Sequence, residues 1–145
     1  MRVAVGSDHA GFLMKESLIA LLDELGHEVL DCGTNSVERV DYPDFGAAVG
    51  RAVANGEAQC GVCVCGSGIG IAMAANKVAG VRAATVWDVT SALLARQHND
   101  ANVICLGQRL IGAEVAAAAL QAWLGADFEG GRHSARVNKI NVLES

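Results

Sequence analysis

The sequence is poor in proline, aromatic residues and positive charge. Among 145 residues there is a single proline, aromatic side chains make up 4%, and 11 Lys and Arg stand against 16 Asp and Glu, for a formal net charge of −5. This balance argues against a nucleic-acid binder, because neutralising phosphates requires a positive surface. Any anion that the chain binds must therefore be met by a local basic cluster.

Signals for export and for membrane insertion are also missing. Asp8 and His9 precede any long apolar run, so the start of the chain lacks the apolar core of a secretory signal. The uncharged stretch 58–76 is long enough to span a bilayer, but it contains four glycines and Ser67. We interpret it as a buried strand, a glycine turn and a helix. Five cysteines, an odd number, suit reduced thiols in a cytoplasmic protein better than a disulfide framework.

The chain does contain a regular alternation of short apolar strands with helical stripes. Its length predicts one domain covering residues 1–145. The pattern predicts strands at 2–6, 28–32, 61–65, 81–86 and 102–106, and helices at 13–25, 43–55, 69–77, 89–97 and 113–124. This order predicts an α/β fold, a three-layer αβα sandwich around a doubly wound, mostly parallel five-stranded sheet of the Rossmann-like kind.

The strongest chemical signal is the segment 65–70 (CGSGIG), which joins a buried strand to a helix. In doubly wound sheets the ligand crevice lies at the carboxyl ends of the strands. Glycines let the backbone approach a ligand closely, and a helix start offers unpaired N–H groups that can hold a phosphate or an oxyanion. The same position favours a thiolate, so Cys65 is predicted to act as a base or nucleophile.

The other cysteines, Cys32, Cys60, Cys63 and Cys105, are predicted to be structural, because they lie in or near apolar strands. A metal site in the run 60–65 is not expected, since it lies on a core strand and lacks a second pair of ligands. No metal or cofactor is predicted. A cysteine redox switch remains an alternative use of these thiols.

Histidine and arginine supply the remaining candidates. His9 follows Asp8 at the end of the first strand, and His98 lies in a polar cluster before the last; either could move protons near neutral pH. The alternative for His98 is an exposed residue at a helix C-terminus, and His133 is predicted to lie on the surface. Arg132 and Arg136 are four residues apart, so a helix would present both guanidinium groups on one face, where they could bind phosphate oxygens. The alternative is a solvated tail helix.

Six motifs occur in one order along nearly the whole chain: 7–12 (SDHAGF), 41–43 (DYP), 65–70 (CGSGIG), 74–77 (AANK), 96–102 (RQHNDAN) and 129–133 (EGGRH). Together they resemble the ribose-5-phosphate isomerase B family, which also contains isomerases of six-carbon sugar phosphates. Ser67 stands where many relatives have threonine, which keeps the hydroxyl. In one branch a glutamate base occupies the position of Ile71; because Ile71 cannot accept a proton, Cys65 remains the predicted base.

The resemblance implies a metal-free aldose–ketose isomerase of the non-oxidative pentose phosphate pathway, which interconverts D-ribose 5-phosphate and D-ribulose 5-phosphate through an enediolate. Cys65 would move the proton between carbons 2 and 1. The enediolate oxygens would be held by the Ser67 hydroxyl and by the amides of Gly66, Ser67, Gly68, Ile69 and Gly70. His98, aided by Asp8, would open the furanose ring, and Asn99 and Tyr42 would contact sugar hydroxyls.

For the phosphate, the resemblance implies His9, Arg109, Arg132 and Arg136, with the last two contributed by a neighbouring subunit. The C-terminal segment, about 126–145, would then reach across to that subunit in a homodimer or tetramer with shared active sites. Two other functions stay open: an isomerase of allose or galactose 6-phosphate, and a non-catalytic sensor that binds phosphosugars or nucleotides.

Overall fold

The computed structural model describes residues 1–144. Its strands form one sheet in the order β2-β1-β3-β5-β4, and every neighbouring pair is parallel. The strands are β1 (Arg2–Ser7), β2 (Glu28–Asp31), β3 (Cys60–Cys65), β4 (Ala83–Thr85) and β5 (Val103–Gly107). The predicted α/β fold with a parallel five-stranded sheet is confirmed.

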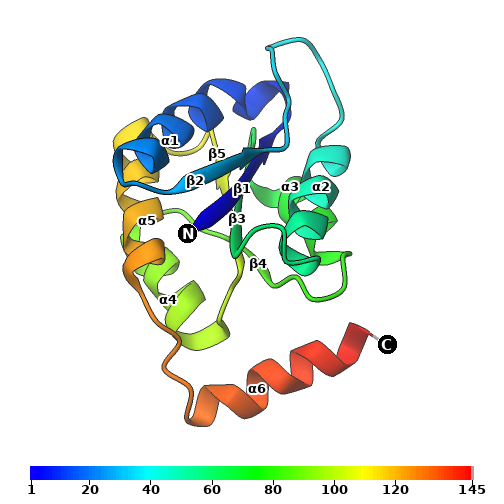
Figure 1. The fold of residues 1–145 in the computed structure, drawn as a ribbon, viewed down its shortest axis with the longest axis vertical. Coiled ribbons are helices and arrows are strands. Elements are labelled where there is room, and N and C mark those ends of the chain that lie inside the picture. The colour runs from blue at the N-terminus through cyan, green and yellow to red at the C-terminus, as the bar shows by residue number, and fades with distance from the viewer. Residues whose placement is uncertain (145) are drawn as a thin grey trace.

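Helices cover both faces of this sheet, as Figure 1 shows. α1 (Phe12–Glu24), α4 (Val89–Asn99) and α5 (Ala113–Gly125) pack on one face, and α2 (Tyr42–Ala54) and α3 (Ile69–Asn76) pack on the other. α6 (Arg132–Asn141) lies beyond the ends where the strands begin. Two 3-10 turns, η1 (His9–Gly11) and η2 (Val142–Glu144), complete the elements. The three predicted layers are present.

The uncharged stretch 58–76 folds as predicted from its glycines. All six residues of β3 are buried, and the chain then turns sharply into α3. A parallel strand covered on both faces has no polar side to present, which explains its uninterrupted apolar sequence. Within residues 1–144, no helix is both long and apolar enough to cross a membrane.

Most of the apolar side of α1 is buried, and one charged side chain is buried with it. Met14, Leu18 and Leu22 enter the core, but Leu25 is 44% exposed because the helix ends at Glu24. Lys15 is completely buried, and its ammonium group contacts Asp31 at 2.9 Å and Glu16 at 3.0 Å. A buried charge is tolerated only when it is paired, so this ion pair fixes α1 to the end of β2.

The outer strand β4 is shorter than the predicted strand at 81–86. On the side of β4 that faces away from β5, the Asn76 side chain forms hydrogen bonds with both backbone groups of Ala83. Its Nδ2 donates to the Ala83 carbonyl at 2.8 Å, and its Oδ1 accepts from the Ala83 amide at 2.8 Å. The amide of Asn76 thus replaces a neighbouring strand at this residue.

The strand order places a topological switch between β1 and β3. From β1 the chain crosses to β2 on one side and then to β3 on the other, so the connections leave β1 and β3 in opposite directions. A crevice opens at such a point, outside the carboxyl ends of the strands. Asp8 follows β1 and Cys65 ends β3 at this position.

Candidate active site

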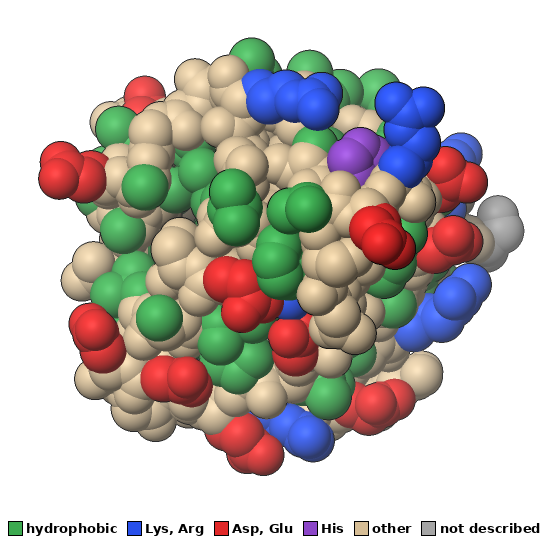
Figure 2. Space-filling view, turned by 90° about the horizontal axis from the view of Figure 1, so that it is seen from above, with side chains coloured by type: hydrophobic (Ala, Val, Ile, Leu, Met, Phe, Trp, Pro, Cys, Tyr) green, Lys and Arg blue, Asp and Glu red, His purple; other side chains and the backbone are tan. Residues whose placement is uncertain are grey.

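A cavity of about 590 Å³ lies at the carboxyl edge of the sheet, where the strands end. Figure 2 looks onto this edge and shows a histidine with basic side chains beside it and hydrophobic side chains around. The cavity is lined by Asp8, His9, Ala10, Tyr42, Cys65, Gly66, Ser67, Ile69, Gly70, Met73, Arg109 and Leu110. The carboxyl-edge cavity therefore brings together nine of the residues singled out from the sequence: Asp8, His9, Tyr42, Cys65, Gly66, Ser67, Ile69, Gly70 and Arg109.

Cys65 is held at the floor of this cavity. The residue is only 4% exposed, yet it lines the cavity, and the Gly68 amide donates to its Sγ at 3.1 Å. A hydrogen-bond donor aimed at sulfur stabilises negative charge there. The first turn of α3 adds amides without helical acceptors, so a negative charge that forms nearby also finds donors.

The neighbouring thiols are kept protonated. Burial raises the pKa of Cys60 to about 11 and also that of Cys32 to about 11. A hydrogen bond with the Cys63 side chain, followed by burial, raises the pKa of Cys105 well above its ordinary value. Their structural role, predicted from their place in apolar strands, is consistent with this chemistry.

Close backbone contacts fix the turn that carries Cys65. Gly68 has a left-handed φ of 75°, and a Cβ there would lie 2.8 Å from the Leu106 carbonyl carbon. At Gly107 a Cβ would lie 2.5 Å from the Ser67 carbonyl carbon. The Thr85 hydroxyl donates to the Gly68 carbonyl at 2.7 Å, a support that the sequence reading missed. The one sequence signal for this hydrogen bond is the position of Thr85, one residue before the end of the predicted strand 81–86.

Gly107→Ala is expected to destabilise the protein by about 1–3 kcal/mol, because backbone atoms of Ser67 cannot move aside without displacing the turn. Thermal or denaturant unfolding measures the change. Gly125→Ala is the matched control, since nothing lies within 4 Å of its added Cβ, and it should leave stability equal or slightly higher. Equal stabilities of both variants would show that the close approach of the two loops is not a constraint.

The side chains of Asp8 and His9 are each held in place by backbone groups. Asp8 is 5% exposed and caps η1, because its Oδ1 accepts from the Gly11 amide at 3.0 Å. His9 Nδ1 lies 3.2 Å from the carbonyl and amide of Val40. Its other nitrogen, Nε2, is therefore the one left for a ligand in the cavity.

Tyr42 and Arg109 also line the cavity. Tyr42 opens α2, with Pro43 in the first turn as predicted, and its ring lies against Gly70, where a Cβ would come within 2.5 Å of Cε1. The Arg109 guanidinium lies over Gly66, and the Arg109 amide donates to the Gly66 carbonyl at 3.0 Å. The positively charged side chain of Arg109 therefore lies over the turn that carries Cys65.

The other predicted site residues lie at the opposite, amino edge of the sheet, where the strands begin. α4 runs back from the end of β4 to the start of β5, and His98 and Asn99 are its last two residues. Five steps of about 3.3 Å along β3 separate the two edges, so His98 and Cys65 of one chain are about 17 Å apart or more. Arg132 and Arg136 project from α6 at this same amino edge and are exposed.

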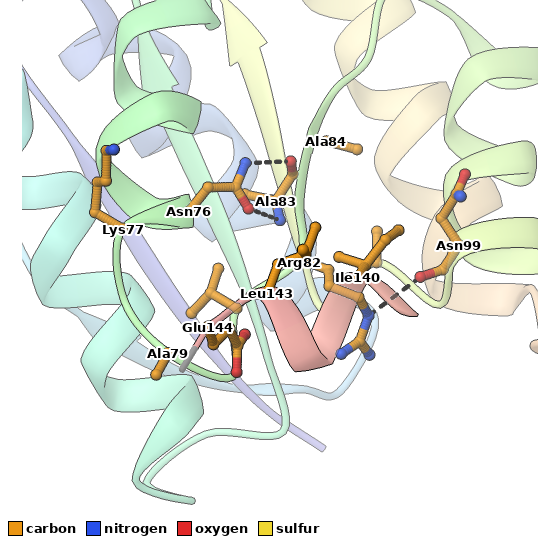
Figure 3. Close-up of a pocket in the computed structure, with 12 residues that line it drawn as sticks. Asn76, Lys77, Ala79, Arg82, Ala83, Ala84, Asn99, Ile140, Leu143 and Glu144 are labelled. Carbon is orange, nitrogen blue, oxygen red and sulfur yellow. Dashed lines mark hydrogen bonds between the residues drawn. The ribbon is translucent and has the colours of Figure 1, made fainter. Parts of the chain in front are cut away.

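Arg82 ties α4 to α6 at the amino edge. Its guanidinium donates to the Asn99 carbonyl at 3.2 Å, to the Asp100 carbonyl at 2.8 Å and to Asn141 Oδ1 at 3.1 Å. Figure 3 shows this arginine beside a cavity of about 620 Å³ that reaches from Lys77 to Asn99. Of the predicted site residues, this cavity includes only Asn99, so the carboxyl-edge cavity is the better candidate.

The prediction that His133 lies on the surface is wrong. It is 7% exposed, and its ring stacks on His98 with the centroids 4.2 Å apart. Burial, and then the proximity of His98 and Arg132, lowers the pKa of His133 below its ordinary value. The segment after α5 folds back against α4, since the Glu129 amide donates to the Gln97 carbonyl at 3.0 Å, and this return is what covers His133.

The parallel α/β fold and the cavity lined by Cys65, His9 and Arg109 match what is expected of a sugar isomerase, and comparison with known proteins shows that the chain belongs to this class. The family model described as Ribose/Galactose Isomerase matches residues 3–140, and the chain belongs to this family. Among its relatives, ribose-5-phosphate isomerase B of Escherichia coli strain K12 is 50% identical over 143 residues, which cover 99% of this chain and 96% of that protein.

Two further comparisons show the range of the family. A D-erythrulose-4-phosphate isomerase of Pectobacterium atrosepticum is 40% identical over 145 residues, covering 99% of this chain and 95% of that protein. The solved structure of ribose-5-phosphate isomerase B from Clostridium thermocellum matches with a TM-score of 0.98 at 46% identity, covering 99% of this chain and 97% of that one. The chain is thus an aldose–ketose isomerase by family.

Proposed function

We propose that this protein interconverts D-ribose 5-phosphate and D-ribulose 5-phosphate, and that it does so in the cytoplasm. The observation that carries the proposal is Cys65, which lines a cavity of suitable size and whose Sγ accepts a hydrogen bond from the Gly68 amide. An aldose becomes a ketose when one base takes the proton from carbon 2 and returns it to carbon 1. A single sulfur beside both carbons performs both steps.

The developing charge of this reaction falls on the oxygens of carbons 1 and 2. Backbone amides from Gly66 to Gly70, together with the Ser67 hydroxyl, surround the cysteine and can donate to these oxygens. Tyr42 lines the same cavity, and its hydroxyl is expected to contact a sugar hydroxyl. Every group in this account belongs to the chain, and none of the steps calls for a metal or another cofactor.

The phosphate and the ring-opening proton require groups that one chain does not bring to the cavity. His9 and Arg109 lie at the carboxyl edge, whereas His98, Asn99, Arg132 and Arg136 lie at the amino edge. We propose that a second copy of the chain places its amino edge over this cavity, with the C-terminal segment 126–145 reaching across. In a twofold dimer the contact is reciprocal, so both copies gain a complete site.

The test is direct. Purified protein is given D-ribose 5-phosphate without added metal, and formation of D-ribulose 5-phosphate is followed in a coupled assay. Turnover with kcat/KM in the usual enzyme range of about 10⁴ M⁻¹s⁻¹ or more supports the proposal. Binding of ribose 5-phosphate without turnover would instead indicate a phosphosugar sensor.

Substrate length is the finer question, because the family includes proteins named for other sugars. D-Allose 6-phosphate and D-galactose 6-phosphate extend the chain by one carbon, about 1.5 Å, and D-erythrose 4-phosphate shortens it by the same amount. Specificity is a ratio of kcat/KM values, so the four substrates are compared by that ratio. A higher value for a hexose or tetrose phosphate would replace the pentose in the proposal.

A further inference from the structure

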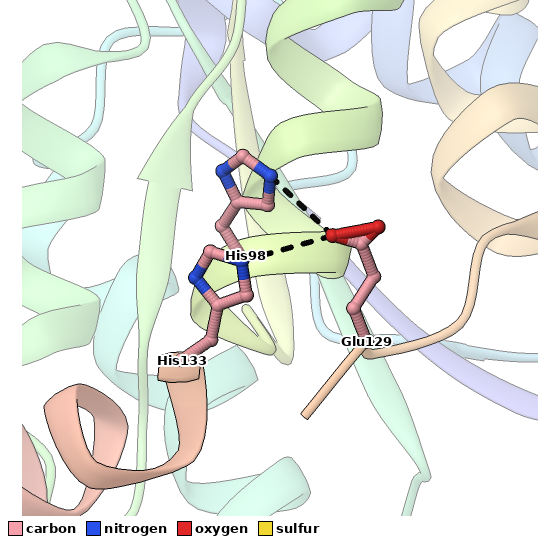
Figure 4. A group of neighbouring side chains, drawn as sticks. All are labelled: His98, Glu129 and His133. Atoms are coloured by element: carbon pink, nitrogen blue, oxygen red, sulfur yellow. Dashed lines mark ion pairs between the residues drawn. The ribbon is translucent and has the colours of Figure 1, made fainter. Parts of the chain in front are cut away.

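Two imidazole rings share one carboxylate at the amino edge, a grouping that the function described above does not use in full. Glu129 Oε1 lies 3.5 Å from His98 Nε2 and 3.7 Å from His133 Nε2. The rings are stacked, with an angle of 13° between their planes. In Figure 4 the second nitrogen of each ring points away from Glu129.

Each member of this cluster is fixed to a different part of the chain. His98 is in the last turn of α4, His133 is in the first turn of α6, and Glu129 is held to α4 by the bond from its amide to the Gln97 carbonyl. His133 is buried while 37% of the His98 side chain is exposed, so of the two imidazoles only His98 is accessible to a substrate.

The arrangement does not suit a metal ion, although the three ligand atoms lie within 4.8 Å of one another. A metal lies in the plane of each imidazole that binds it, at about 2.0–2.1 Å from the nitrogen. Rings stacked with their centroids 4.2 Å apart and nearly parallel planes place their lone pairs in two separate planes, so the lone pairs do not meet at one point.

The charged groups around the two rings leave Glu129 as their shared partner. Burial is the largest cause that lowers the pKa of His133, followed by the nearby His98 and then by Arg132 and Arg136 on α6. On the α4 side, Asp100 is occupied by Arg96 at 2.9 Å and by Arg82 at 3.5 Å. Among residues 1–144, Glu129 is therefore the carboxylate paired with both rings, and an imidazole whose Nε2 carries its hydrogen would direct that N–H at it.

We propose that Glu129 and His133 are positioning residues for His98. Glu129 holds the hydrogen on Nε2, which leaves Nδ1 of His98 as a proton acceptor turned toward the substrate, and the buried ring of His133 holds the His98 ring in that plane. This rests on the proposed function. During ring opening, Nδ1 takes the proton of the anomeric hydroxyl, the C1–O4 bond breaks with its electron pair on O4, and O4 receives that proton.

Two rates separate this role from a structural one. Isomerisation of ribose 5-phosphate needs ring opening, whereas exchange of the carbon 1 proton of ribulose 5-phosphate with D₂O does not, because that ketose is acyclic when its O5 carries phosphate. Glu129→Gln is expected to lower kcat/KM for ribose 5-phosphate about tenfold, a part of the roughly 10²–10⁴ that general acid–base catalysis provides. The exchange rate should stay within about twofold of the native rate.

Asp127→Asn is the matched control, since Asp127 is an exposed carboxylate on the same segment, and it should change neither rate. The His98→Asn background gives a second control: there, Glu129→Gln should have no further effect, because its action passes through His98. NMR titration adds a readout independent of activity. The Glu129 carboxylate raises the pKa of His133, so Glu129→Gln should lower that pKa further.

Four outcomes would overturn the positioning role: isomerisation unaffected by Glu129→Gln, both rates falling together, a tenfold loss that persists in His98→Asn, or an unchanged titration of His133. Failure of the proposed function looks different. In that case the native protein neither isomerises ribose 5-phosphate nor exchanges the proton of ribulose 5-phosphate, while the NMR result still reports on the carboxylate.

Discussion

Replacing Cys65 with alanine is expected to lower kcat/KM for ribose 5-phosphate about a thousandfold, within the 10²–10⁴ range for loss of a general base. The reason is local. Cys65 is the cavity-lining thiol, and its sulfur holds the hydrogen bond from Gly68, whereas burial keeps Cys60 and Cys32 protonated. Serine at this position should also fail, because a hydroxyl ionises far less readily than a thiol. Affinity for ribose 5-phosphate, measured by calorimetry, should change little because the proposed phosphate contacts are elsewhere.

The control for this substitution is Cys32→Ala, which removes a half-buried thiol that does not line the cavity. It should retain turnover close to that of the native protein. If Cys65→Ala isomerises ribose 5-phosphate at the native rate, another group is the base and the proposed mechanism fails.

Two inactive variants, Cys65→Ala and His98→Asn, are expected to restore activity when their subunits are mixed. In a mixed dimer one site combines Cys65 of one chain with His98 of the other, and the second site lacks both. Random reassociation of equal amounts makes half of the dimers mixed, each with one intact site of two, so activity should return to about a quarter of the native value. The basis is the placement of the two residues at opposite edges of the sheet.

The experiment needs subunits that exchange, which mild denaturation and refolding of the mixture achieve. Each variant refolded alone is the control and should stay inactive. Absence of recovered activity in a mixture that native mass spectrometry shows to contain mixed dimers would mean that the two residues act within one chain.

The sequence predicted the parallel sheet and the cysteine turn well because their signals are local. β3 is apolar at every position, and the glycines after it permit the positive φ of Gly68 and the approach of Gly107 to Ser67. Most element bounds were correct within one or two residues. The strand order was not predicted, since it depends on which helix packs on which face.

The position of His98 relative to Cys65 could have been derived from the sequence. A residue that precedes a parallel strand lies at the amino edge, whereas Cys65 follows a strand and lies at the carboxyl edge. The burial of His133 and of Lys15 could not have been derived from the sequence, because both depend on tertiary contacts. His133 is covered when Glu129 folds back onto α4, and Lys15 pairs with Asp31.

Asn76 has a consequence for how copies of this protein associate. An open outer strand is a template onto which another chain can add, and repeated addition produces fibres. Because the side-chain amide of Asn76 already engages both backbone groups of Ala83, the three-residue β4 offers little room for such growth. Self-association is thereby directed away from open-ended polymerisation and toward closed assemblies formed through side chains.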